Sequence, residues 1–215
     1  MEKLLLTRIA NYLMMNASFQ DDLGVYRGKM GCVLFFAHYS RYTNQLYYGE
    51  FASELLDEIC ESINDYTPVD FAYGICGIAW GIEHLVQQNF TQGDTGDILQ
   101  DLNTKIMEWD PSRIQNLSFE KGLKGIAYYI RVHTQSPYAI TKTISIDYLT
   151  KLNRTLLKSG LEPMSVPVNG LNFPETMSQK IVNMNVNVND KAELSTYPLG
   201  VVGGLAGLGL KMIGL

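Results

Sequence analysis

Charged residues are scarce in this chain of 215 residues, of which only 18% are charged, whereas 46% are hydrophobic. A composition of this kind indicates many buried helices, or a surface that a partner covers. The net charge of -5 and the pI of about 5.2 show that the chain also lacks an excess of basic residues. Because phosphate binding needs a basic face, nucleic acid is excluded as the main partner.

Long hydrophobic runs and cysteines are few as well. No run approaches the roughly 18 apolar residues that span a bilayer, so no membrane span is expected. Residues 1–8 lack an uninterrupted apolar core and a small-residue cleavage site, so we expect no signal peptide. The three cysteines are odd in number and lie within helical patterns. They are therefore predicted to be reduced, buried thiols in a cytoplasmic protein.

Strand patterns are weak, and helical periods dominate the chain. Amphipathic outer helices are predicted to alternate with inner helices that are apolar on nearly all sides. A first helix is expected over residues 2–15, inner helices over 28–42, 75–86 and 122–132, and outer helices over 48–63, 94–108 and 144–157. A long connector is expected at about 160–198. It contains an alternating stretch, 181–188, that is compatible with a strand. The fold class is all-α, in one domain over residues 1–215.

Four Gly-x-x-Gly pairs follow one another along the chain, each with an apolar residue three positions before its first glycine. The pairs begin at Gly28, Gly74, Gly122 and Gly204, and the preceding apolar residues are Val25, Phe71, Phe119 and Val201. The first glycines are 46, 48 and 82 residues apart. Spacing that repeats and then roughly doubles indicates one repeated unit with an insertion before its last copy.

Each glycine pair opens an inner helix. Because glycine has no Cβ, the pair is expected to let the first turn approach a neighbouring helix closely. The N-termini of these helices are expected to present unsatisfied N–H groups around one rim, where a ligand would bind.

The glycine pairs at this repeat length resemble the lanthionine synthetase C-like (lanthionine cyclase-like) family. The best matches are residues 74–81 (GICGIAWG) and 204–210 (GLAGLGL). The resemblance runs from about residue 24 to the C-terminus, with the 160–198 connector unmatched. It implies an α/α toroid. The family has roughly twice the hairpins found here, so a partial toroid of about four outer/inner hairpins is expected.

The family's reaction adds a cysteine thiolate of a modified peptide to a dehydrated Ser or Thr, and zinc holds that thiolate. The resemblance places its ligands, two Cys and one His, one and two positions before the first glycine of two successive pairs. The corresponding residues here are Tyr26 and Arg27, Ala72 and Tyr73, Glu120 and Lys121, and Val202 and Gly203. None is Cys or His. Because a catalytic zinc needs three protein ligands, we expect no metal and no cofactor at these positions.

The remaining histidines and cysteines are predicted to be structural. His38 and His84 each lie seven residues after the second glycine of a pair, on the face of the helix that packs against neighbours. Cys32 and Cys76 do not occupy equivalent positions and are predicted to lie in the core. His133 ends an inner helix, where a cation is favourable at the helix C-terminus.

Several rim residues are candidates for function. Tyr26, Arg27, Tyr73 and Lys121 could line a mouth that binds a peptide or another ligand. Asp70 and Glu120 are candidates for a catalytic carboxylate pair, since α-helical toroids also occur in glycoside hydrolases. Asp22 and Asp70 also precede helix starts, where a carboxylate favours the helix dipole.

Three functional hypotheses follow. The leading one is a non-catalytic lanthionine cyclase-like protein that binds a peptide or protein partner in a peptide-modification system. The second is an enzyme, either a peptide cyclase or lyase or a carbohydrate-active hydrolase, which uses rim residues other than the family zinc site. The third is a structural subunit: four hairpins cannot close a ring, so homo-oligomerisation or a partner subunit would cover the apolar sides of the end hairpins.

Overall fold

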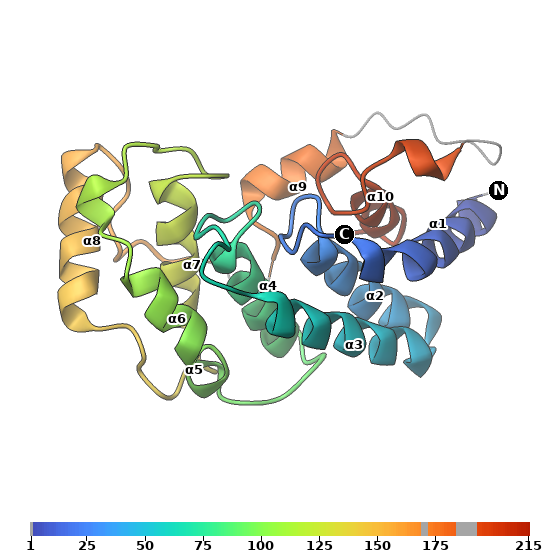
Figure 1. Ribbon diagram of the computed structural model, residues 1–215, viewed down its shortest axis with the longest axis horizontal. Coiled ribbons are helices and arrows are strands. Elements are labelled where there is room, and N and C mark those ends of the chain that lie inside the picture. Colours follow the sequence, from blue (N-terminus) through green and yellow to red (C-terminus); the bar gives the residue numbers. More distant parts are fainter. Residues whose placement is uncertain (1, 169–171, 184–192) are drawn as a thin grey trace. The chain divides into compact units, whose positions relative to one another are not determined.

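The computed structural model describes residues 2–168, 172–183 and 193–215, and the regular structure in these ranges is entirely helical (Figure 1). The predicted all-α fold class is therefore confirmed for the described residues. None of the helices within them has the length and hydrophobicity that crossing a membrane requires.

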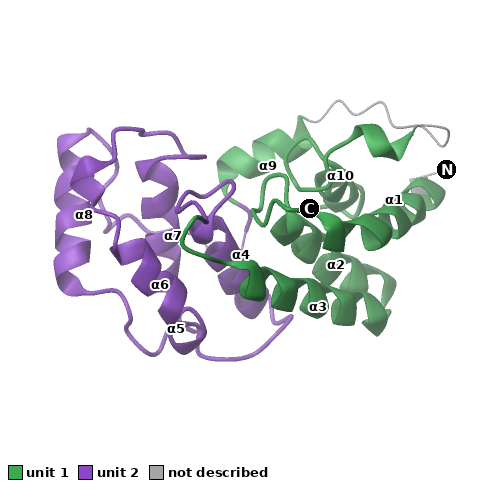
Figure 2. Ribbon diagram, viewed as in Figure 1, with its two compact units in different colours: residues 1–66, 174–215 green, residues 67–173 purple. Residues whose placement is uncertain are grey.

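The chain forms two compact units (Figure 2). Unit 1 comprises residues 1–66 and 174–215, and unit 2 comprises residues 67–173. The organisation of 1–215 as one domain stays a prediction.

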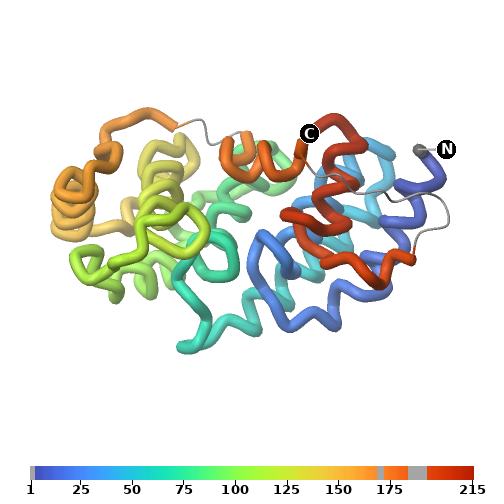
Figure 3. The backbone as a smooth tube through the Cα atoms, turned by 90° about the horizontal axis from the view of Figure 1, so that it is seen from above, coloured from blue at the N-terminus to red at the C-terminus, as the bar shows by residue number. Residues whose placement is uncertain are grey.

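In unit 1, an almost fully buried helix is surrounded by other helices. This helix is α2, Lys29–Thr43, and every residue from Lys29 to Tyr39 is buried. It packs against α3 (Leu46–Ser62) and α10 (Leu205–Met212), and α10 also contacts α1 (Glu2–Asn16) and α9 (Glu175–Val182). Figure 3 shows α10 beside α1 and α2, although about 160 residues of chain separate α10 from α2. Short 3-10 turns occupy Ala17–Phe19 and Leu194–Thr196.

The more deeply buried of the two inner helices of unit 2 is α4, Ile75–Gln87, all of whose residues are buried. It packs against α7 (Leu123–Gln135) and α6 (Gln100–Met107). The fully buried Trp80 of α4 lies at the centre of this core, with its ring 5.5 Å from that of Phe71. The unit is completed by α5 (Thr95–Ile98), α8 (Ile146–Lys158) and a 3-10 turn at Pro111–Arg113.

Outer helices bury a single stripe, as their amphipathic patterns predict. In α8 the stripe is Tyr148, Leu152 and Leu156, spaced four residues apart. In α3 it is Tyr48, Ala52, Leu55 and Ile59. The two helix classes expected from the sequence are thus both present, one fully buried and one exposed on a polar face.

Two predicted elements differ in the structure. The helix expected over 94–108 is broken at Leu99 into α5 and α6. The carboxylate of Asp94 accepts hydrogen bonds from the main-chain N–H groups of Ile140 and Thr141, both at 2.9 Å, which holds the start of α5 against that loop. The strand compatible with 181–188 is wrong at Ile181 and Val182, which belong to α9, and its part from 184 on lies outside the described residues. The helix after the fourth glycine pair, α10, begins at Leu205 and has 8 residues.

Candidate functional site

Each glycine pair closes a short loop onto the start of its inner helix. In all four copies, the residue after the first glycine donates its N–H to the carbonyl oxygen seven positions earlier, at 2.8 Å. These bonds run from Lys29 to Asp22, from Ile75 to Pro68, from Leu123 to Asn116 and from Leu205 to Pro198. The prediction of unsatisfied N–H groups at the rim is therefore wrong for these four donors, because each helix is closed by its own preceding loop.

The same loop explains why the pairs are glycine. A Cβ on Gly74 would overlap the carbonyl oxygen of Pro68, and the first glycines of the other three copies face the equivalent oxygens in the same way. The φ angles of -105° at Gly28 and -128° at Gly74 are open to any residue, so the requirement is space and not φ. Close approach is thus made to the preceding loop, and not chiefly to a neighbouring helix as the sequence suggested.

In unit 2, the second and third loops pair with each other through equivalent positions. We call residues 68–74 and 116–122 the unit 2 paired loops. The N–H of Ala72 donates to the carbonyl of Glu120 at 2.9 Å. The rings of Phe71 and Phe119, each three positions before a first glycine, lie 4.8 Å apart. The ammonium of Lys121 stands 4.8 Å from the ring centre of Tyr73, so these two predicted rim residues are brought together.

In unit 1, the first and fourth loops pair in a similar way. Val202 donates its N–H to the carbonyl of Tyr26 at 2.8 Å, and Gly200 donates to that of Arg27 at 3.1 Å. The side chain of Arg27 is exposed, but Tyr26 is only 3% exposed, and the Lys180 ammonium covers its ring at 5.1 Å. Of the two predicted rim residues in this unit, only Arg27 is therefore exposed enough to contact a ligand.

The candidate carboxylates take part in loop structure. Oδ1 of Asp70 accepts the N–H of Tyr73 at 2.8 Å, and Oδ1 of Asp22 accepts that of Gly24 at 2.8 Å. Burial raises the pKa of Asp22, although the Gly24 N–H and the charge of Arg27 oppose the rise. Glu120 contributes its main-chain carbonyl to the paired loops. A catalytic role for Asp70 and Glu120 stays a prediction.

The residues at the family's zinc positions do not fit zinc. Two of the eight are the cationic Arg27 and Lys121, and none offers a thiolate or an imidazole. Burial raises the pKa of the Cys32 thiol to about 12, and burial together with the charge of Asp70 raises that of Cys76 well above its ordinary value. Both thiols therefore stay protonated near neutral pH. Across the described ranges, no three His, Cys, Asp or Glu side chains are grouped to hold a metal ion.

Two of the three histidines predicted to be structural, His38 and His84, are buried within inner helices. Burial and the nearby Arg41 lower the pKa of His38 to about 4, so it is neutral at pH 7. The ring of His84 lies 5.4 Å from that of Trp80. Cys32 and Cys76 are buried as predicted, but Cys60 is exposed, because it lies on the solvent side of the amphipathic α3. The expectation that all three thiols are buried is wrong at Cys60.

A buried polar cluster in unit 2 joins α4, α6 and α7. Nδ1 of His133 lies 2.6 Å from Oε1 of Glu83, and these residues are 2% and 0% exposed. Gln87 donates to the other Glu83 oxygen at 3.2 Å. The sequence predicts only that His133 interacts with the C-terminal end of its helix. The structure shows in addition that its side chain points into the core and pairs with Glu83.

Hydrogen bonds on the far side of the imidazole fix its tautomer. Nδ2 of Asn103 lies 3.0 Å from Nε2 of His133, and Asn103 also donates to Oγ1 of Thr143 at 2.8 Å. The Tyr129 hydroxyl donates to Oδ1 of Asn103 at 2.6 Å, which leaves the Asn103 amide nitrogen facing the imidazole. Since an amide nitrogen only donates, Nε2 is the acceptor and Nδ1 carries the proton that points at Glu83. Burial, followed by the charge of Glu83, raises the pKa of Tyr129 well above its ordinary value, which keeps this donor protonated.

The sequence interpretation missed Glu83, Asn103 and Thr143. One signal was present: Glu83 is a single charged residue within an otherwise apolar inner helix, where a buried charge needs a partner. Its partner lies 50 residues away, so no local pattern identifies it.

Comparisons with known proteins agree with the repeat. No curated protein and no solved structure gives a significant match. The family model described as lanthionine synthetase C-like protein matches residues 20–210, which include all four glycine pairs and the loops that they close. This chain therefore belongs to the lanthionine synthetase C-like protein family.

Proposed function

We propose that the chain is a non-catalytic member of this family, which binds a peptide or protein partner through its paired loops. The observation that carries the proposal is the set of residues before the glycine pairs. The positions that would hold a zinc-binding thiolate and imidazole contain tyrosine, arginine and lysine among their residues. Zinc activates a thiol through three nitrogen or sulfur ligands, and these loops supply none.

The unit 2 paired loops offer the better-defined binding surface. Tyr73 is half-buried, so one part of its ring is fixed by the loop, while the Lys121 side chain over it is exposed. Aromatic residues held in this way bind with little loss of conformational entropy and are frequent in protein interfaces. The lysine adds a positive charge. A peptide segment that carries a carboxylate beside an apolar side chain matches this pair. In unit 1, the exposed Arg27 gives the first of the two paired loops a positive charge as well.

The binding proposal is tested by panning a library of random peptides displayed on phage against the whole chain. We expect selected peptides to be rich in Asp or Glu and to bind K121E and Y73A at least about ten-fold more weakly, which corresponds to about 1.4 kcal/mol. The matched control is K158E, which changes the charge equally on an exposed lysine at the end of α8.

Two outcomes would refute the paired loops as the binding site. One is a selection whose peptides bind K121E and Y73A as tightly as the parent chain. The other is equal weakening by K158E, because that would show attraction to overall charge only.

A further inference from the structure

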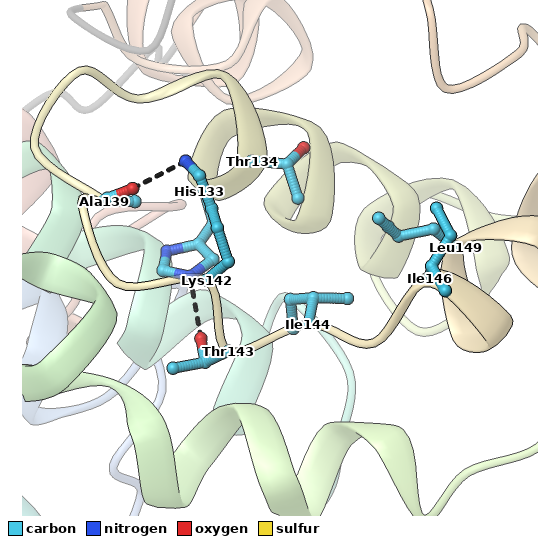
Figure 4. A pocket seen from close by; sticks show the side chains of 8 residues that line it. All are labelled: His133, Thr134, Ala139, Lys142, Thr143, Ile144, Ile146 and Leu149. Carbon is cyan, nitrogen blue, oxygen red and sulfur yellow. Dashed lines mark hydrogen bonds between the residues drawn. The ribbon is translucent and has the colours of Figure 1, made fainter.

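A small pocket lies at the C-terminal end of α7, next to the buried polar cluster. It has a volume of about 220 Å³. Its walls come from the end of α7, the following loop and the first turn of α8 (Figure 4). The lining residues are His133, Thr134, Ala139, Lys142, Thr143, Ile144, Ile146 and Leu149. The 13 residues of α7 rise about 20 Å, so the pocket and the Lys121 end of the helix are far apart.

The size of the pocket restricts its occupant. Pockets that enclose a whole small-molecule ligand measure about 300–1,000 Å³, and this one is smaller. A volume of about 220 Å³ suits one large side chain of a polypeptide. Part of the mouth is also apolar, since the lining residue Ile146, at the start of α8, is 75% exposed. These features favour a side chain presented by a partner protein or peptide.

The lining is apolar on its walls and polar at one end. Ala139 and Ile144 are buried wall residues, at 2% and 8% exposure. At the polar end, Oγ1 of Thr143 lies 2.8 Å from Nδ2 of Asn103 and 3.3 Å from Nε2 of His133 (Figure 4). Asn103 donates to this hydroxyl, and Nε2 of His133 is an acceptor for its proton, so Thr143 keeps one lone pair that can accept a hydrogen bond from another partner.

The polar end is held rigidly. His133 is fixed through Nδ1 by the fully buried Glu83, and Asn103 is fixed by Tyr129. On the other side, the Lys142 ammonium donates to the carbonyl of Ala139 at 2.7 Å, which closes the loop that forms one wall (Figure 4). A hydroxyl held in this way loses little entropy when it binds a ligand.

We propose that this pocket binds a tyrosine side chain of a polypeptide partner, with the phenol ring against the apolar walls and its hydroxyl bonded to Thr143. Tyrosine combines a large apolar ring with a polar tip, which matches the distribution of groups in the lining. A leucine or phenylalanine would fill the walls but would leave the Thr143 hydroxyl desolvated and without a bond to the occupant. The assignment goes beyond the binding proposed for the paired loops and does not depend on it.

The test uses p-cresol, the tyrosine side chain as a free molecule, and toluene, which lacks the hydroxyl. Each is titrated into the whole chain labelled with ¹³C at isoleucine and leucine methyl groups. We expect p-cresol to shift the methyl signals of Ile144, Ile146 and Leu149 at roughly millimolar concentration, as befits so small a ligand. Its affinity should exceed that of toluene by about five-fold or more, the effect of one hydrogen bond.

Variants at Thr143 separate the hydroxyl from the shape of the pocket. T143V is expected to bind p-cresol and toluene equally, and T143S, which keeps the hydroxyl, should restore the preference. L157A, at an exposed leucine of α8 outside the lining, serves as the control and should leave both affinities unchanged. Absence of methyl shifts at these three residues would overturn the proposal, and so would equal binding of toluene and p-cresol to the parent chain. Neither result bears on K121E or Y73A, so failure here is distinct from failure of the paired-loop proposal.

Discussion

G74A is expected to destabilise unit 2 by about 3 kcal/mol or more. The added Cβ would overlap the Pro68 carbonyl oxygen, which accepts the first N–H of α4 at 2.8 Å. The loop must move to remove the overlap, and the movement breaks this hydrogen bond at the start of a fully buried helix. Overpacking alone costs about 1–3 kcal/mol, and an unsatisfied buried donor adds about 1–3 kcal/mol.

Urea denaturation followed by tryptophan fluorescence measures this effect in the correct unit, since both tryptophans, Trp80 and Trp109, belong to unit 2. The matched control is G160A. Nothing lies within 4 Å of a Cβ at Gly160, whose φ of +67° makes alanine strained but not overlapped. It should therefore cost only about 1–2 kcal/mol. Equal losses of stability in G74A and G160A would show that the loop does not require the glycine for space.

E83A is expected to cost about 3–5 kcal/mol of stability. Removal of the carboxylate leaves the Nδ1 proton of His133 and the amide of Gln87 buried without this acceptor. It also leaves a cavity in the core beside α4. Breaking a buried pair by removing one partner is costly because the other partner stays desolvated. The fluorescence experiment that measures G74A also measures this variant.

Two comparisons make the Glu83 result specific. E54A, which removes an exposed carboxylate from the outer helix α3, should change stability by less than about 0.5 kcal/mol. E83Q keeps an oxygen that can accept the His133 proton, so it should lose less stability than E83A. If E83A were as stable as the parent chain, the buried cluster would not contribute to the fold.

The sequence predicts most of the helices because their signals are local. The apolar runs after Gly28, Gly74 and Gly122 give α2, α4 and α7 within a few residues, and the apolar stripes of α3 and α8 identify the outer helices. The repeated glycines likewise indicate the family. What these signals describe is a period along one segment, and such a period does not depend on contacts between distant parts of the chain.

The features that escaped prediction depend on distant contacts. The hydrogen bonds of Asp94 hold the start of α5 against a loop about 46 residues further on. The pairing of Glu83 with His133 joins two helices, and the sequence shows only a charged residue without an evident local partner. At the rim, the glycines indicated that the backbone packs closely against another group. They did not indicate that this group is a carbonyl of the preceding loop.

We propose that the paired loops bind a partner without the family's zinc chemistry, and the zinc content of the purified chain tests the absence of that chemistry most directly. The whole chain is equilibrated with zinc, passed through a desalting column and analysed for metal by mass spectrometry. We expect far less than one zinc ion per chain, because no thiolate or imidazole stands at the positions before the glycine pairs. One tightly held zinc ion per chain would contradict the absence of zinc chemistry.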